Sequence, residues 1–207
     1  MRPLPRVHAI TDAAVIALAD FPVRAAAIAA AGSPVALHAR DRGAGGGALA
    51  KVALRMLALA DPPEASVFVN ARPDVAAATE AQGLQLGADD LTPADARVTF
   101  TRGWIGRSVH SLLEAEQAAK EGANFLMVGS VYATPSHTGH PPAGIALVRE
   151  SVALGLPVIA IGGIDAGRAS EVRDQGAWGV AAITALWRAP DPAAAALSLL
   201  APWMEGA

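Results

Sequence analysis

Short apolar runs alternate with amphipathic stretches along the whole chain. Continuous apolar runs of this length are typical of strands that are buried on both faces of a parallel sheet. The expected strands are 7–10, 35–39, 66–69, 84–86, 104–106, 125–128, 158–161 and 178–182. Helical patterns cover about 14–31, 47–60, 74–81, 111–121, 145–154, 166–175 and 191–203, and a short one follows Thr92.

This order of elements predicts an α/β fold made of βα units with right-handed crossovers. Eight such units favour a closed (β/α)8 barrel, the TIM barrel, and 207 residues lie at the short end of its range of about 200 and more. An open doubly wound sheet is the alternative. No Gly-x-Gly-x-x-Gly follows the first strand, which disfavours its dinucleotide-binding form. The Gly-rich piece 43–47 is too short for a linker, so we expect residues 1–207 to form a single domain.

Composition excludes several classes of protein. With 53% hydrophobic and 17% charged residues, the chain can bury a large core. It has no cysteine, hence no disulfide, thiolate nucleophile or thiolate metal ligand. A net charge of −3 gives no electrostatic case for nucleic acid, and no apolar run reaches the ~20 residues of a membrane span. The first residues lack the apolar segment of a signal peptide. We therefore expect a cytoplasmic protein that binds neither nucleic acid nor membrane.

In a barrel of this kind, the active site is built from the loops that follow the strands. His110 follows the fifth strand and could carry a proton near neutral pH, or it could be an inert residue at a helix start. Ser111 is the better N-cap, so capping does not require His110. His8 and His38 lie within strands, and we expect them to be structural. Other polar and glycine residues at strand ends are Asp12, Arg40, Asp41, Asn70, Arg72, Gly87, Asp89, Asp90, Ser108, Ser130, Gly162, Gly163 and Thr184.

The last two loops suggest a phosphate site. Gly162 and Gly163 would let backbone amides approach a ligand, and Thr184 opens a helix whose N–H groups point outward. The alternative is that the glycines only turn the chain and Thr184 only caps. Because the glycines and the helix start lie together in the last two loops, where this fold commonly binds phosphate, we favour a phosphate site.

Three further positions keep two interpretations open. Arg40 could bind a carboxylate or phosphate, or form a rim salt bridge. Arg72 could simply pair with Asp74 or Asp12. The loop 133–142 is polar and long, which predicts a mobile lid. Its His137 and His140 fit a solvated loop better than a metal site.

Four motifs resemble those of the thiamine phosphate synthase/TenI superfamily. They are His8-Ala-Ile-Thr-Asp12, Val69-Asn-Ala-Arg72 with Asp74, Gly106-Arg-Ser-Val-His-Ser111 with Glu114-Ala115, and Ala160-Ile-Gly-Gly-Ile164. The resemblance spans nearly the whole chain and implies a (β/α)8 barrel. It also implies one of two activities. The synthase joins an aminopyrimidine diphosphate to a thiazole phosphate with magnesium, and the TenI-type tautomerase aromatises a thiazole phosphate carboxylate without a metal.

Departures from the synthase pattern favour the tautomerase. The synthase has Asn-Asp after the third strand, with the Asp on magnesium, whereas this chain has Asn70-Ala71, and alanine offers no oxygen ligand. The synthase pattern Gln-x-Arg-x-Lys on the second strand becomes Ala36, His38 and Arg40. The synthase has a lysine in the loop after the sixth strand, in a Thr-x-Thr-Lys pattern, and here that stretch is Thr134-Pro-Ser136-His137. Asp90 could keep one magnesium contact.

The resemblance assigns His110 as the acid/base residue, with no metal and no cofactor. We expect Arg40 to hold the substrate carboxylate. The remaining substrate-binding residues are Asn70, Gln85, Ser108, Thr134 and Ser136, and the phosphate-binding residues are Gly162, Gly163, Ile183 and Thr184. The partner is a small thiazole phosphate. The sequence does not fix the oligomeric state, and a homodimer is compatible with it. The rival functions are the magnesium-dependent synthase, a non-catalytic thiazole-phosphate-binding regulator and an unrelated isomerase on the same barrel.

Overall fold

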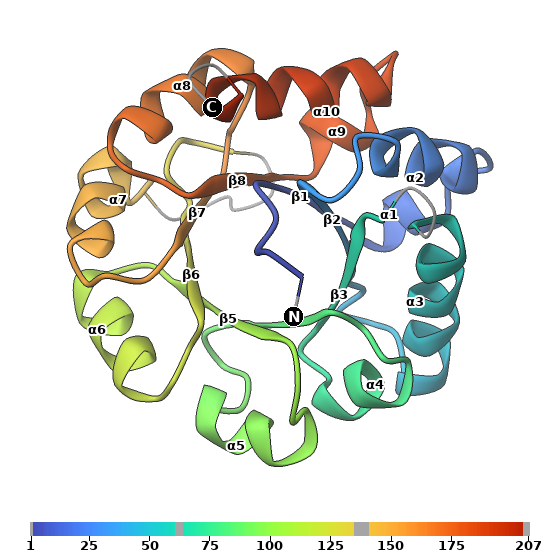
Figure 1. The fold of residues 1–207 in the computed structure, drawn as a ribbon, viewed down its shortest axis with the longest axis horizontal. Coiled ribbons are helices and arrows are strands. Elements are labelled where there is room, and N and C mark those ends of the chain that lie inside the picture. The colour runs from blue at the N-terminus through green and yellow to red at the C-terminus, as the bar shows by residue number, and fades with distance from the viewer. Residues whose placement is uncertain (1, 61–63, 135–140, 205–207) are drawn as a thin grey trace.

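Eight parallel strands close into a barrel in the computed structural model, which describes residues 2–60, 64–134 and 141–204. Each strand pairs with the next along the chain, and the last pairs with the first (Figure 1). The predicted barrel is therefore confirmed. The strands are β1 (Val7–Ile10), β2 (Val35–Ala39), β3 (Ser66–Asn70), β4 (Gly83–Leu86), β5 (Trp104–Val109), β6 (Phe125–Val128), β7 (Val158–Ile161) and β8 (Gly179–Ala182).

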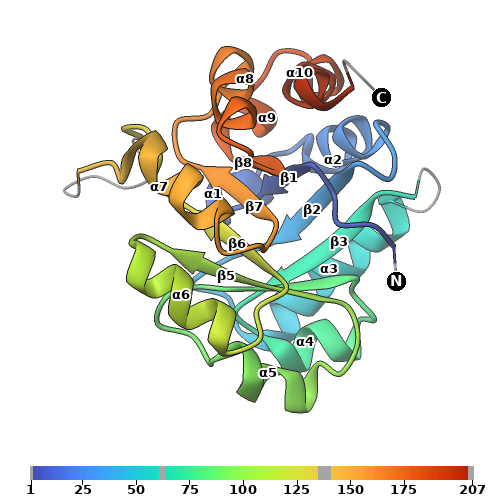
Figure 2. The ribbon, with the colours of Figure 1, turned by 60° about the vertical axis from the view of Figure 1, so that its left-hand side comes forward.

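Helices form an outer layer around the strands (Figure 2). Several begin at an Asp, Ser or Thr whose side chain accepts a backbone N–H of the first turn, as expected for N-caps. The helices are α1 (Ala13–Ile16), α2 (Phe21–Ala29), α3 (Gly46–Ala60), α4 (Pro73–Ala78), α5 (Pro93–Thr99), α6 (Leu112–Lys120), α7 (Gly144–Val152), α8 (Ala166–Asp174), α9 (Thr184–Trp187) and α10 (Pro192–Leu200), with the 3-10 turn η2 (Ala201–Trp203).

Two predicted elements differ most from the structure, and most of the others differ by one to three residues at an end. The expected helix 14–31 is two helices, α1 and α2, because Pro22 lies in the first turn of α2. Proline fits the start of a helix but removes a hydrogen bond from its interior. Strand β5 runs to Val109 instead of ending at 106, since Arg107 and Ser108 pair with β6. The histidine motif thus begins inside a strand.

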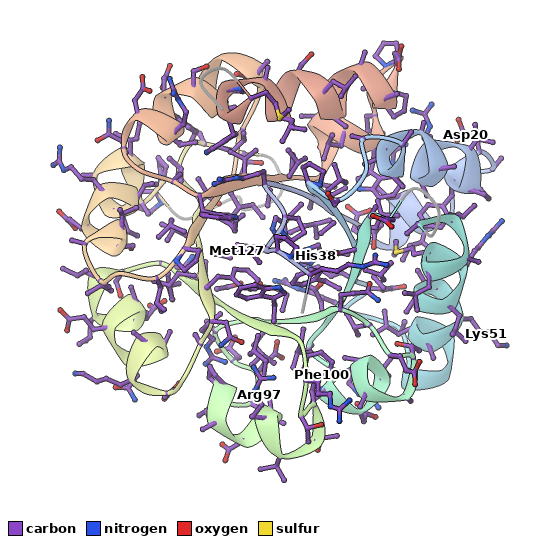
Figure 3. All side chains as sticks on the ribbon, in the orientation of Figure 1. Asp20, His38, Lys51, Arg97, Phe100 and Met127 are labelled. Carbon is purple, nitrogen blue, oxygen red and sulfur yellow. The ribbon has the colours of Figure 1, made fainter. Side chains whose placement is uncertain are left out.

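Aromatic side chains fill the barrel interior opposite glycines. A Cβ on Gly83 would lie 2.1 Å from the Phe68 ring, and one on Gly106 would lie 2.1 Å from the Phe125 ring. Figure 3 shows Met127 and His38 inside the ring of strands, whereas Lys51 points away from it. The interior is therefore packed solid, as is usual for this fold.

The N-terminal segment covers the amino end of the barrel. Trp104 Nε1 donates to the carbonyl of Arg2 at 3.0 Å, and Trp178 Nε1 donates to that of Leu4 at 3.1 Å. The Arg6 guanidinium lies 3.5 Å from the centre of the Trp178 ring. In Figure 1 this segment crosses the ring of strands. This segment therefore closes the barrel interior at its amino end. None of the helices in the described parts of the chain is long and apolar enough to span a membrane.

Candidate active site

His110 stands directly after β5, between the ends of β5 and β6. Its backbone N–H donates to Glu114 Oε2 at 2.7 Å, and Ser111 caps α6, as expected. Its Nδ1 hydrogen-bonds to the carbonyl of Gly129. Because a carbonyl only accepts, the neutral ring carries its proton on Nδ1 and its lone pair on Nε2. Nε2 is therefore the atom that can take up a proton.

Asn70, Gln85 and Ser108 come together at the ends of β3, β4 and β5. Gln85 Nε2 donates to Ser108 Oγ at 3.0 Å, and Asn70 is the register partner of Gln85. Ser108 accepts this bond and so retains its O–H as a donor. Gln85 Oε1 is buried and has no hydrogen-bond partner among the described residues. The structure thus assembles these three predicted residues in one polar row, while their contacts to a substrate stay a prediction.

Arg40 lies at the end of β2, held by Thr11. The Arg40 N–H donates to Thr11 Oγ1 at 3.0 Å, and Thr11 Oγ1 donates to the carbonyl of His38 at 2.8 Å. The half-buried guanidinium forms no hydrogen bond or ion pair with the described residues. Burial lowers its pKa first and the charge of Arg42 lowers it further, whereas the carboxylates of Asp12, Asp41 and Asp90 raise it. A desolvated guanidinium that makes no direct ion pair with the described residues is suited to bind an anionic ligand group.

The carboxylates around this end bind backbone or arginine groups. Asp12 accepts the N–H of Val15 at 2.8 Å as the cap of α1, and Asp90 accepts the N–H of Gly87 at 2.6 Å. Arg72 pairs with Asp74 at 2.8 Å, the alternative expected for it. The described residues contain no group of three or more His, Cys, Asp or Glu side chains that could hold a metal ion.

Gly162 and Gly163 have φ angles of +100° and +65°. A Cβ on Gly162 would lie 2.6 Å from the Cβ of Ser130, and one on Gly163 would lie 2.8 Å from the carbonyl of Ala133. The loop after β6 therefore packs against these glycines, and this packing already requires them. A contact between them and a phosphate stays a prediction.

The first part of the loop after β6 is tied to α8. Tyr132 donates to Glu171 at 2.7 Å, and burial together with Glu171 raises the pKa of Tyr132 to about 12. Arg168 donates to the carbonyl of Gly163 at 2.7 Å and lies 4.5 Å from the centre of the Tyr132 ring. Thr134 follows this anchored part. Ser136, His137 and His140 lie outside the described residues, so their expected roles are untested.

Thr184 opens a helix after the last strand, as expected. Ile183 is its N-cap and contributes no side-chain cap. Helix α9 is a single turn, so its first N–H groups point out of the helix while its dipole is short. Phosphate binding at Ile183 and Thr184 stays a prediction.

Two hollows lie among the described residues, and the smaller one is lined in part by Ser108 of this site. One of about 100 Å³ borders α6 near Glu114 and Gln117, and one of about 570 Å³ lies at the amino end near Gln82 and Trp104. The candidate site is therefore defined by its side chains, not by an enclosed cavity.

A closed barrel with a histidine, an arginine and a polar row at its carboxyl end has the arrangement of a (β/α)8-barrel enzyme. The chain belongs to the TMP-TENI family, described as "Thiamine monophosphate synthase", whose sequence profile matches residues 7–186. It is 46% identical over 147 residues to "Thiamine-phosphate synthase" of Thermus thermophilus, with 70% of this chain and 71% of the relative covered. The same name is carried by a Mycolicibacterium vanbaalenii relative, 40% identical over 88% of this chain and 86% of its own.

Solved structures agree with this family. "Thiamine phosphate pyrophosphorylase from Pyrococcus furiosus" superposes with a TM-score of 0.82 at 31% identity, covering 97% of this chain and 96% of that one. More distant barrels, such as "Native KDPGal structure" at 16% identity and a TM-score of 0.70, share the fold alone. The superfamily expected from the motifs is confirmed, and the protein is an enzyme of a thiamine-biosynthesis family. The relatives are named as synthases, and none of these names specifies a tautomerase.

Proposed function

We propose that this protein is a thiazole tautomerase, which aromatises a thiazole phosphate carboxylate by moving one proton. The observation that carries the proposal is the pair of side chains on β2 at the two positions where the synthase pattern has Gln and Arg. Ala36 and His38 are fully buried there, and His38 binds His8 and Asn70 inside the barrel. Neither residue offers a hydrogen bond or a charge to a diphosphate at the carboxyl end.

His110 would act as both base and acid. Its Nε2 takes the proton from the ring carbon, so that a C–H bond breaks, an N–H bond forms and the electron pair moves into the conjugated system. The same N–H then delivers the proton to the exocyclic carbon, which leaves an aromatic isomer and a neutral imidazole. The Gly129 carbonyl, which accepts from Nδ1, would stabilise the imidazolium between the two steps.

The other side chains would orient the substrate. Arg40 makes no direct ion pair with the described residues and would hold the carboxylate, and Ser108 would donate its O–H to the developing intermediate. The phosphate would bind at Gly162, Gly163, Ile183 and Thr184, and Thr134 and Ser136 stay predicted substrate contacts from the resemblance. Fixing the ring in this way places the reacting carbon against His110.

A second candidate is thiamine phosphate synthase, which the names of the relatives favour more directly than the tautomerase. That reaction would need a magnesium site. Magnesium prefers carboxylate oxygens, whereas position 71 is alanine and Asp90 is bonded to Gly87. The described residues therefore do not fit this metal site.

One experiment separates the two reactions. The purified protein is incubated with the thiazole phosphate carboxylate tautomer, with and without magnesium, and the aromatic product is followed by NMR. In parallel, it is incubated with the aminopyrimidine diphosphate, thiazole phosphate and magnesium, and thiamine phosphate is measured. We expect metal-independent aromatisation and no thiamine phosphate. Thiamine phosphate without accelerated aromatisation would establish the second candidate, and binding without either product would indicate a regulator.

The variant Ala71→Asp sharpens this result. Ala71 has a φ of +64°, a conformation that Asp and Asn tolerate better than most residues, so the backbone can accept the change. If the missing carboxylate limits synthase activity, Ala71→Asp gains magnesium-dependent thiamine phosphate formation. Ala71→Asn, of nearly the same size but uncharged, is the matched control and should gain none.

A further inference from the structure

A chain of three hydrogen-bond contacts runs through the barrel interior to Asn70. His8 Nε2 lies 3.2 Å from the carbonyl of Pro5, and His8 Nδ1 lies 2.8 Å from His38 Nε2. His38 Nδ1 lies 3.1 Å from Asn70 Oδ1. The two histidines are fully buried and Asn70 is half-buried. The contacts therefore connect the covered interior with a residue at the carboxyl end.

Both imidazoles are in surroundings that favour the neutral form. The ring of Phe68 stacks on His38 with centroids 4.9 Å apart, and Phe68 and Phe125 both contact His8. Burial lowers the pKa of His8 to about 4 and that of His38 well below its usual range. The other charges acting on His38 are those of His8 and Arg40, and both lower its pKa further.

Two neutral histidines supply two N–H groups for three contacts, and this fixes the direction of the chain. The Pro5 carbonyl can only accept, so His8 carries its proton on Nε2. His8 Nδ1 then accepts from His38 Nε2–H, which leaves a lone pair on His38 Nδ1. That lone pair needs a donor, and the nearest group is the amide of Asn70. The oxygen Oδ1 cannot donate, so we assign the Asn70 amide with Oδ1 and Nδ2 exchanged, which places Nδ2 against His38 Nδ1.

We infer that His8 and His38 are positioning residues that hold Asn70 with its amide nitrogen inward and its Oδ1 toward the ligand. Asn70 is then an acceptor, and the ligand group that meets it must carry an N–H or O–H. A carboxylate or phosphate oxygen is excluded from that position, which leaves these groups to Arg40 and the final loops. The identity of the ligand rests on the proposed function, but the direction of the chain does not.

Nitrogen NMR of the ligand-free protein tests this direction without any substrate. The protein is labelled with ¹⁵N-histidine, and its five histidines are assigned with single variants. We expect both His8 and His38 to be protonated at Nε2 and bare at Nδ1 at pH 7. Protonation of both at Nδ1 would reverse the chain and overturn the inference, and so would an imidazolium at either position. Failure of the proposed reaction would leave this result unchanged.

The variant Asn70→Asp provides a second NMR measurement. A carboxylate has no proton to donate, so His38 Nδ1 must itself become protonated. Either the proton of His38 moves from Nε2 to Nδ1, and His8 Nδ1 is then protonated to donate to Nε2, or His38 gains a second proton that pairs with the carboxylate and His8 is unchanged. We expect the His38 Nδ1 signal to change from a bare to a protonated nitrogen. If His38 Nδ1 stays bare in the Asn70→Asp variant, residue 70 does not set the direction.

Binding of thiazole phosphate distinguishes positioning from simple packing. His38→Asn keeps an oxygen near the place of Nδ1 that can accept from Asn70, whereas His38→Leu of similar volume keeps none. If the Asn70 amide is no longer held, it takes both orientations, which weakens ligand binding by about a factor of two. Its side-chain motion weakens binding further. We expect binding about two- to five-fold weaker in His38→Leu and within twofold of wild type in His38→Asn. Equal losses in both variants, measured by calorimetry on folded protein, would contradict the positioning role.

Discussion

The two sides of the barrel's carboxyl end differ in which part of the chain they present. On the side of β1 to β5, here called the side-chain side, polar side chains are held by hydrogen bonds: Asn70 bonds to the buried His38, and Gln85 bonds to Ser108. On the side of β6 to β8, here called the backbone side, the loops present glycines with positive φ and a single-turn helix. His110 lies between the sides, bonded to the Gly129 carbonyl after β6.

This difference suggests a division of roles. Fixed side chains can distinguish donors from acceptors, so the side-chain side is suited to recognise the reacting part of a substrate. Backbone N–H groups are suited to a phosphate, which needs several donors and little discrimination. The four predictions below test this division, beginning with the residue that lies between the two sides.

Replacing His110 by Asn should have the largest effect. Asn cannot take up the proton, so the rate of thiazole aromatisation should fall by roughly 10²–10⁴ while thiazole phosphate still binds. Steady-state kinetics and calorimetry measure the two quantities. Lys120→Gln, an exposed change on α6, is the control and should leave both unchanged. Full activity in His110→Asn would rule out the proton transfer proposed here.

Arg40→Ala tests the carboxylate contact on the side-chain side. Hydrogen bonds to charged groups contribute about 1.5–3 kcal/mol, so KM for the carboxylate substrate should rise about 10- to 100-fold. Affinity for thiazole phosphate, which lacks that carboxylate, should change little. The exposed neighbour Arg42, changed to Ala, is the control for lost positive charge. An equal loss for both ligands would instead place Arg40 on the phosphate.

The buried histidines should make stability depend on pH. Their pKa values in the folded chain lie below the unfolded value of about 6.5, so the unfolded chain binds protons first as the pH falls. The free energy of unfolding should therefore be highest above pH 6.5 and fall toward pH 4, by about 1.4 kcal/mol per pH unit for each histidine. Urea unfolding of wild type and His38→Asn at pH 7, 6 and 5 measures this. The variant should lose one histidine's share of the slope, and identical slopes would contradict a buried neutral His38.

Gly163→Ala should have a smaller effect, on the backbone side. The positive φ and the 2.8 Å approach of the Ala133 carbonyl should lower the free energy of unfolding by about 1–2 kcal/mol. Gly167→Ala is the matched control, because it lies in α8 with its nearest contact at 3.5 Å, and it should be neutral or slightly stabilising. If inorganic phosphate protects wild type but not folded Gly163→Ala from unfolding, this loop binds phosphate. Equal protection would assign Gly163 to loop packing alone.

The alternation of apolar runs determined the eight strands and the barrel, because buried parallel strands need continuous apolar sequence. It also placed His110 and Thr184 at the carboxyl end of the barrel, because the residues that follow a strand in the sequence lie at that strand's carboxyl end. The break of 14–31 into two helices was readable from Pro22, which is unsuited to a helix interior. The family motifs pointed to the superfamily that the comparisons then confirmed.

Contacts between side chains of neighbouring strands were beyond the reach of the sequence. His8 and His38 looked like isolated strand residues, and only the pairing of β2 with β1 and β3 in the barrel brought them together and onto Asn70. The pairing of β4 with β5 put Gln85 against Ser108, and that of β6 with β7 put the loop after β6 against Gly162 and Gly163. Sequence periodicity reports which way a side chain faces, whereas the partner it meets there depends on strand register and barrel closure, which are properties of the tertiary structure.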